Sequence, residues 1–154
     1  MRDDFRVIRI STEQCMDLRT RILRPGQDIK HCQYNEDNNP TTFHLGVIDG
    51  DIHKNNKIIC NGTFMQMDHV LFPNTQNAYR LRGMATDKNY QGKGLGTLLL
   101  QESFKILKTR GCDLLWCNAR EKAFLFYERS GFKTIGDMFD IPGAGPHKVM
   151  WRNI

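Results

Sequence analysis

Three glycines and one lysine lie in a short segment that leads directly into an apolar stretch: Tyr90-Gln91-Gly92-Lys93-Gly94-Leu95-Gly96-Thr97-Leu98-Leu99-Leu100. Glycines let the backbone turn sharply and bring bare N–H groups close to a ligand. The apolar stretch predicts a helix, whose first turn adds unpaired N–H donors and the positive end of its dipole. A segment of this kind can bind a phosphate or pyrophosphate group.

The spacing of these glycines excludes two nucleotide-binding motifs. The segment lacks the G-x-x-x-x-G-K-[S/T] pattern of a P-loop, and Thr97 stands where the dinucleotide fingerprint G-x-G-x-x-G needs its third glycine. The register that fits is Q-x-x-G-x-G, formed by Gln91, Gly94 and Gly96. An ordinary glycine-rich turn before a helix has the same composition, so this segment alone leaves both interpretations open.

A second segment downstream supplies the missing context. After a predicted strand at 112–118 comes Ala123-Phe124-Leu125-Phe126-Tyr127-Glu128-Arg129-Ser130-Gly131-Phe132. The two segments in this order resemble the two signatures of the GNAT superfamily of N-acetyltransferases, which bind acetyl-CoA. The resemblance covers residues 78–132 closely and the remainder loosely. The glycine- and proline-rich segment that ends in His147 resembles, more weakly, the ElaA-like branch of that superfamily.

The patterns along the chain predict a mixed α/β (α+β) fold in a single domain, residues 1–154. Ser11 and Gln14 form a capping-box pattern at the start of the first helix, and residues 50–56 form a polar hairpin connection. The resemblance implies a mostly antiparallel six- to seven-stranded sheet flanked by about four helices, splayed between strands four and five, where pantetheine pairs with the open edge. The expected strands are 5–10, 42–49, 57–68, 78–86, 112–118, 132–140 and 147–152, with helices from 11, within 28–39, and at 94–109 and 120–130.

The resemblance also implies which residues bind acetyl-CoA. The end of the fourth strand contacts pantetheine and the acetyl carbonyl through its backbone, where a donor stabilises a developing oxyanion. Asn118 then hydrogen-bonds the pantetheine arm, although asparagine also suits a helix N-cap, and Lys93 and Thr97 can equally be solvated. The expected cofactor-binding set is Met84, Ala85, Thr86, Gln91, Gly92, Lys93, Gly94, Leu95, Gly96, Thr97, Asn118 and Tyr127.

Two side chains are candidates for proton transfer during acetylation of a primary amine in a ternary complex. Tyr127 can protonate the departing CoA thiolate as a general acid, or it can belong to an aromatic core with its phenylalanine neighbours. An alkyl amine must lose a proton before it attacks, and His147 has a suitable intrinsic pKa. A structural histidine with a water as the base is the alternative, and His44 and Glu13 are lesser candidates. Cys117 as a covalent acyl carrier, and an acetyl-CoA-binding sensor without turnover, stay open.

Arginines in the first helical region and the fourth strand are candidates for binding the acceptor. In GNAT proteins the first helices wall the acceptor pocket, so Arg24 and Arg82, together with Arg19, can face an acidic acceptor. Arginines on a solvated helix face or at a sheet edge have the same pattern, so both interpretations stay open.

Composition narrows the class of protein. The 154 residues suit one core, and the 40% hydrophobic content with only short apolar runs argues against a membrane span. Five cysteines without a C-x-x-C pair argue against disulfides or a metal site. The net charge of +5 is spread through the chain, which favours a solvated surface over nucleic-acid binding. We expect a cytoplasmic enzyme, with no signal peptide, a small-molecule or peptide amine acceptor and a possible homodimer.

Overall fold

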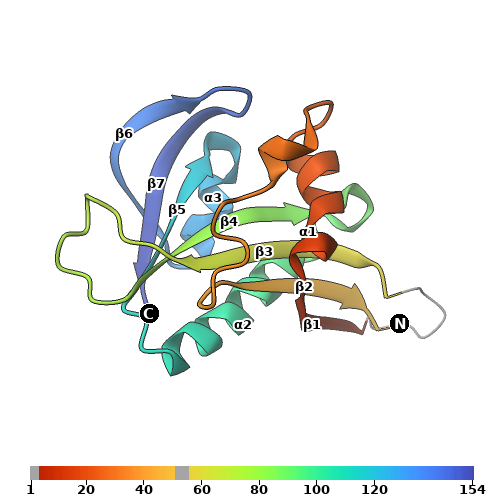
Figure 1. Cartoon of the computed structure of the whole chain (residues 1–154), viewed down its shortest axis with the longest axis horizontal. Helices are drawn as coiled ribbons and strands as arrows, with labels where there is room; N and C mark the ends of the chain where they lie inside the picture. The colour runs from red at the N-terminus through yellow and green to blue at the C-terminus, as the bar shows by residue number, and fades with distance from the viewer. Residues whose placement is uncertain (1–3, 51–55) are drawn as a thin grey trace.

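The computed structural model describes residues 4–50 and 56–154, and a seven-stranded sheet of order β1-β2-β3-β4-β5-β7-β6 forms its centre (Figure 1). Neighbouring strands are antiparallel except β4 and β5, which run parallel. The strands are β1 (Phe5–Ile10), β2 (Phe43–Asp49), β3 (Ile58–Gln66), β4 (Ala78–Thr86), β5 (Leu114–Arg120), β6 (Lys133–Ile141) and β7 (Gly145–Asn153).

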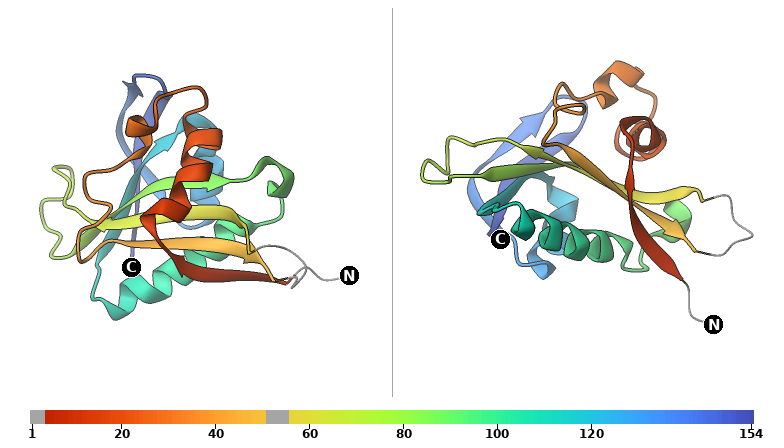
Figure 2. Two further views of the ribbon diagram at one scale, coloured as in Figure 1. Left: turned by 45° about the vertical axis from the view of Figure 1, so that its right-hand side comes forward. Right: turned by 60° about the horizontal axis from the view of Figure 1, so that its bottom comes forward.

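Helices cover the two faces of the sheet differently (Figure 2). One face carries α1 (Thr12–Leu18), the π-helical turn η1 (Arg19–Leu23) and the 3-10 turn η2 (Ile29–Cys32), and the other carries α2 (Leu95–Thr109) and α3 (Phe124–Arg129). The 3-10 turns η3 (Lys88–Tyr90) and η4 (Glu121–Ala123) lead into α2 and α3. The buried leucines of α2 pack into the main core with the inward side chains of β2 to β5.

The sequence-based expectations for fold class and for the position of most elements are confirmed. The Ser11–Gln14 capping box is present, with the Ser11 N–H donating to Gln14 Oε1 at 2.8 Å. The expected polar connection at 50–56 falls mainly on residues outside the described ranges, as does the very start of the chain.

The extent or the type of some expected elements differs in the structure. β5 runs on to Arg120, because its last residues pair with β7, and the helix expected at 120–130 therefore begins as the 3-10 turn η4. The polar segment within 28–39 forms one 3-10 turn, so the described residues hold three α-helices and several shorter turns where about four helices were expected.

The parallel strands β4 and β5 part halfway along their length. Residues 78–81 pair with residues 114–117, and beyond Leu81 and Cys117 no backbone pairing joins the two strands. A bulge contributes, because Gly83 has a φ of +68° and the β3–β4 register shifts between Asn61 and Thr63. Left-handed backbone of this kind favours glycine. The predicted splay between the fourth and fifth strands is therefore present.

Candidate active site

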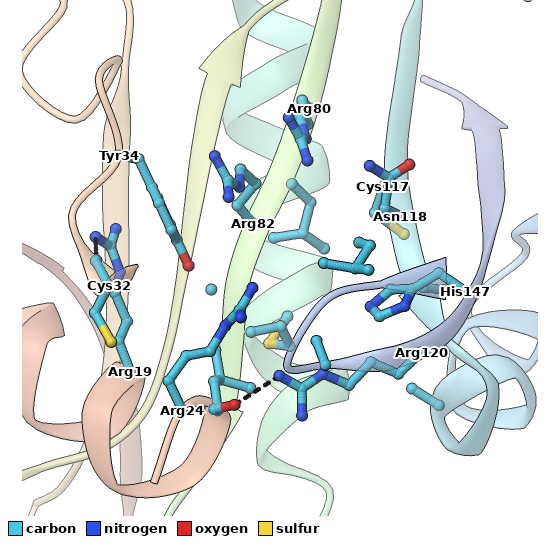
Figure 3. A pocket seen from close by; sticks show the side chains of 18 of the residues that line it. Arg19, Arg24, Cys32, Tyr34, Arg80, Arg82, Cys117, Asn118, Arg120 and His147 are labelled. Carbon is cyan, nitrogen blue, oxygen red and sulfur yellow. Dashed lines mark hydrogen bonds between the residues drawn. The ribbon is translucent and has the colours of Figure 1, made fainter. Parts of the chain in front are cut away.

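A cavity of about 140 Å³ opens where β4 and β5 part. Side chains from η1, β4, β5, α3 and β7 line it, together with the segment after η2 and the loop between β6 and β7 (Figure 3). Residues i and i+2 of a strand share a face. Arg80 and Arg82 therefore lie on the same face of β4. Asn118 and Arg120 likewise lie on the same face of β5. The cavity brings together the expected residues Arg24, Arg82, Met84, Asn118, Tyr127 and His147.

Tyr127 lines this cavity from α3. Its side chain is buried, and its ring packs edge-on against Phe126 and Phe132 with centroids 4.9 and 5.2 Å apart. Burial raises the pKa of the Tyr127 phenol well above its usual value, and the thiols of Cys117 and Cys60 act in the same direction. The residue is thus both a core aromatic and a hydroxyl that stays protonated at neutral pH beside the cavity, where a strong base such as a departing thiolate can take its proton.

Cys117 packs against Tyr127 and is fully buried in β5. Burial raises the pKa of its thiol to about 12, although Arg80 and the hydrogen bond with Tyr127 act in the opposite direction. Only a thiolate is an effective nucleophile. At neutral pH Cys117 therefore lacks the form that a covalent acyl carrier needs.

His147 enters the cavity from β7, opposite Arg120 in the strand register. Its Nδ1 lies 2.7 Å from the Gly145 carbonyl oxygen, which can only accept a hydrogen bond, so Nδ1 carries the hydrogen and Nε2 the lone pair. Burial lowers the pKa of His147, the charges of Arg120 and Arg24 lower it further, and the Gly145 contact offsets this only in part. The neutral imidazole can accept a proton at Nε2.

The glycine segment forms an open turn at the start of α2. Gly94 is the N-cap residue in the left-handed region, with a φ of +77°, and no side chain caps the first turn. Gly92 also has a positive φ, and a Cβ placed on either residue would meet no atom within 4 Å. The first turn of α2 is therefore uncapped by side chains, and the space beside Gly92 and Gly94 is open, an arrangement that suits a phosphate group.

Gly96 has a different role from its neighbours. A Cβ at this position would lie 2.8 Å from Cζ of Phe126, so the glycine allows α2 and α3 to approach each other. Gln91 also makes a contact within the protein. Its Nε2 donates to the Thr86 carbonyl at 3.1 Å and holds the turn against the end of β4.

Asp87 fixes the other end of this turn. It is buried, it accepts from the Asn89 N–H at 3.0 Å, and it forms ion pairs with Arg21 at 3.0 Å and Lys57 at 3.4 Å. Sequence reasoning did not identify Asp87 as a residue that positions the glycine turn, although its place directly before the turn was a usable signal.

The open stretch of β4 and β5 has unused hydrogen-bonding capacity. Ala85 and Thr86 pair with β3 on one side, and on the other side Met84, Ala85 and Thr86 have no partner in β5. The Oδ1 atom of Asn118 is buried and has no hydrogen-bond partner among the described residues. A buried acceptor without a partner is costly, so this site fits an amide-rich ligand such as a pantetheine arm.

The arginines of the cavity fall into two groups. Arg19 is fully buried, and its guanidinium forms two 2.8 Å contacts with the Asp37 carboxylate, so it is structural and not free to bind an acceptor. Arg24 and Arg82 line the cavity as expected. Arg80 and Arg120 line it as well.

The lesser candidates for the base lie elsewhere. His44 does not line the cavity, because its ring is buried between Thr63, at 2.7 Å from Nδ1, and the Asp37 carbonyl, at 3.1 Å from Nε2. Glu13 is exposed in the first turn of α1.

Comparison with known families decides the class of this site. Residues 10–132 match the model of the Acetyltransferase (GNAT) family. The chain belongs to the GNAT family. Within this GNAT fold, the opened strands β4 and β5 and the glycine turn before α2 are the features that the resemblance led us to expect.

Relatives and solved structures agree with this assignment. An uncharacterized N-acetyltransferase of Bacillus subtilis (strain 168), YitI, is 39% identical over 146 residues, which cover 94% of this chain and 93% of the relative. The crystal structure of Escherichia coli ElaA matches with a TM-score of 0.72 at 16% identity, covering 98% of this chain and 99% of that chain. A chain of the NatC complex bound to Gag peptide and CoA matches with a TM-score of 0.78 at 17% identity, covering 98% of this chain and 99% of that chain. This GNAT protein is thus an acetyl-CoA-dependent N-acetyltransferase.

The described part of this GNAT chain holds neither a cluster of metal ligands nor a helix suited to span a membrane. In residues 4–50 and 56–154, no three His, Cys, Asp or Glu side chains gather as metal ligands do. Over the same ranges, no helix is both long enough and apolar enough to cross a bilayer.

Three charged or aromatic residues that line the cavity were not predicted from the sequence: Arg80, Arg120 and Tyr34. Arg80 and Arg120 each stand two positions from a predicted site residue on the same strand, Arg82 and Asn118, so strand alternation was a signal that could have found them. Tyr34 also lines the cavity, but it comes from an irregular polar segment that has no periodicity to indicate its direction.

Proposed function

We propose that this protein moves the acetyl group of acetyl-CoA to a primary amine by direct attack within a ternary complex. One observation carries the proposal. A protonated Tyr127 and a neutral His147 line the same cavity at the parting of β4 and β5.

The residues for binding acetyl-CoA follow from the unsatisfied groups of the site. The uncapped first turn of α2, with the glycine turn before it, binds the pyrophosphate, and the open edge of β4 with Asn118 binds the pantetheine arm. The proposed set is the sequence-predicted one, in which Gln91 and Gly96 contribute by shaping the turn: Met84, Ala85, Thr86, Gln91, Gly92, Lys93, Gly94, Leu95, Gly96, Thr97, Asn118 and Tyr127.

Two side chains, His147 and Tyr127, take part in the proton transfers of this reaction. Nε2 of His147, directly or through a water, accepts a proton from the ammonium form of the acceptor, because alkyl amines have pKa values near 10.4 and are charged at neutral pH. The free amine attacks the thioester carbon, a C–N bond forms, and backbone N–H groups at the end of β4 stabilise the charge on the carbonyl oxygen. The C–S bond then breaks, and the Tyr127 hydroxyl protonates the departing sulfur. The nitrogen loses its second proton as the amide forms, and water carries a proton back to the Tyr127 oxygen.

Direct attack is favoured over a covalent acetyl-enzyme because the nearest thiol is unreactive. Two cysteines line the cavity: burial raises the pKa of Cys117, beside Tyr127, to about 12, and burial also raises the pKa of Cys32. Cys117→Ala is therefore expected to keep a kcat close to the wild-type value.

The decisive test combines binding and turnover. Isothermal titration with acetyl-CoA is expected to show binding in the wild type and loss of binding in Gly94→Glu, whose carboxylate fills the turn. Thiol release with a panel of amines then measures transfer. Binding without release for any amine would instead identify an acetyl-CoA sensor, and no binding would overturn the proposal.

Tyr127→Phe tests the general acid. We expect kcat to fall about 10- to 100-fold, at the low end for general acid catalysis, because a thiol with a pKa of about 8.5 leaves readily. Tyr79→Phe is the matched control, since Tyr79 is equally buried but lies outside the cavity. A kcat in Tyr127→Phe equal to that of the control would remove Tyr127 from the chemistry. The cytoplasmic location and the homodimer stay predictions from the sequence.

A further inference from the structure

Two arginines of β4 face the cavity without an oxygen acceptor of their own. Figure 3 shows Arg80 and Arg82 on the same strand, between Tyr34 and Asn118. Among the described residues, neither guanidinium donates to a carboxylate or a carbonyl. Arg24 and Arg120 differ in this respect, because they donate to the carbonyls of Pro142 and Leu23.

Arg80 is the more enclosed of the pair. Its Nε is buried without a hydrogen-bond partner, and its guanidinium contacts the Met67 sulfur, 3.8 Å from Nη1, and the Trp116 ring, 4.9 Å from Cζ. Burial, followed by the neighbouring charge of Arg82, lowers its pKa to about 10. Arg80 therefore stays charged at neutral pH in a place where charge is costly without an anionic partner.

Arg82 is held in place by stacking. Its Cζ lies 3.8 Å from the centroid of the Tyr34 ring, and Cζ of Arg19 lies 3.9 Å from the same centroid. Arg19 is in turn fixed by its paired contacts with Asp37. Stacking orients the guanidinium and leaves its N–H groups available, which is the arrangement that suits recognition of a carboxylate or phosphate.

No acidic side chain among the cavity-lining residues neutralises this charge. Glu36, which does not line the cavity, partly offsets the charge of Arg80, and both oxygens of Asp37 are already engaged, because they accept from Arg19 and Oδ2 also accepts from the Tyr34 N–H at 2.9 Å. Arg24 and Arg120 add to the positive charge at the same cavity. A cationic acceptor such as a polyamine would be repelled by the arginines that line the cavity, whereas an anionic group would find unused donors.

We propose that the acceptor is a small molecule whose primary amine is accompanied by a carboxylate or a phosphate, and that Arg80 and Arg82 bind this anionic group. The inference rests on the proposed acetyl transfer and names its substrate class. The cavity of about 140 Å³ is roughly ten times the 10–15 Å³ that a single water needs, so it has room for a small molecule.

The experiment compares matched acceptors by thiol release at saturating acetyl-CoA. One pair is an amino sugar and its phosphate ester, and the other is an amino acid and its amide, so the two pairs distinguish phosphate from carboxylate. The anionic member of at least one pair should have a kcat/KM at least tenfold higher than its neutral partner.

Variants assign that preference to the arginines. Arg82→Gln should raise the acceptor KM by about 10- to 100-fold, as expected for loss of a charge-assisted contact, and leave the acetyl-CoA KM unchanged. Arg82→Lys should recover only part of the loss, and Arg80→Gln should repeat the effect. Arg129→Gln removes the same charge from an exposed position of α3 outside the cavity and should behave as wild type.

The outcomes separate this inference from the proposed function. Turnover with neutral or cationic amines that equals or exceeds turnover with the anionic ones would overturn the inference and leave acetyl transfer intact. If no amine is acetylated, the anion site is tested by calorimetry of the CoA-loaded protein with inorganic phosphate and with succinate. Binding that is lost in Arg82→Gln supports the anion site, and no binding overturns it.

Discussion

At the scale of single residues, burial does chemical as well as structural work in this site. Tyr127 packs among phenylalanines as a core residue would, and the same burial raises its pKa and keeps the hydroxyl protonated. Burial acts in the same direction on the neighbouring Cys117 and makes that thiol unreactive. One apolar environment therefore keeps the Tyr127 hydroxyl protonated and the neighbouring Cys117 thiol unreactive.

His147 gives a prediction about pH. Burial and the nearby arginines lower its pKa, so the neutral base persists below pH 6.5, where an ordinary histidine is already half protonated. The acid limb of kcat, measured with both substrates saturating, should lie below pH 6.5. His147→Gln should lower kcat and remove this limb, whereas the exposed His31→Gln should leave the profile unchanged. A limb that persists in His147→Gln would assign the base to water or another group.

At the scale of elements, Gly96 is where α2 and α3 come into contact. Alanine normally favours a helix over glycine by about 1 kcal/mol, but here its Cβ would lie 2.8 Å from the Phe126 ring. Gly96→Ala should therefore destabilise the protein by about 1–3 kcal/mol, the usual cost of overpacking, measured by urea unfolding. Adding Phe126→Leu should recover part of this loss, and purely additive effects would contradict the proposed contact.

The elements that could be predicted from sequence are those with strong local patterns. Strand alternation, the capping box at Ser11 and the glycine turn before α2 depend on neighbours in the chain, and the structure confirms them. The direction of Tyr34 and the role of Arg80 depend on segments far apart in sequence that stack together only in the fold. Arg19 shows the same limit, since its partner Asp37 lies in a loop without periodicity.

At the scale of the whole molecule, a buried polar network joins that loop to the sheet and to the site. Arg19 contacts Asp37, the Cys32 carbonyl and the Thr63 hydroxyl, and His44 contacts Thr63 and the Asp37 carbonyl. The network thus ties η1, the loop after η2, β2 and β3 together. Because Tyr34 stacks on Arg19 on one side and Arg82 on the other, the network also orients the wall of the cavity.

Asp37→Ala tests this coupling between stability and site geometry. Removing one partner of a buried ion pair leaves an uncompensated charge, so the free energy of unfolding should fall by about 3–5 kcal/mol. Glu36→Ala removes a carboxylate from the adjacent, less buried position and should cost far less. Asp37→Asn, which keeps oxygen and loses charge, should retain the fold at low temperature and still raise the acceptor KM, since Arg19 would then turn away from Tyr34 and release Arg82. If Asp37→Asn lowers the unfolding midpoint without changing the acceptor KM, the network stabilises the fold and has no part in positioning the acceptor site.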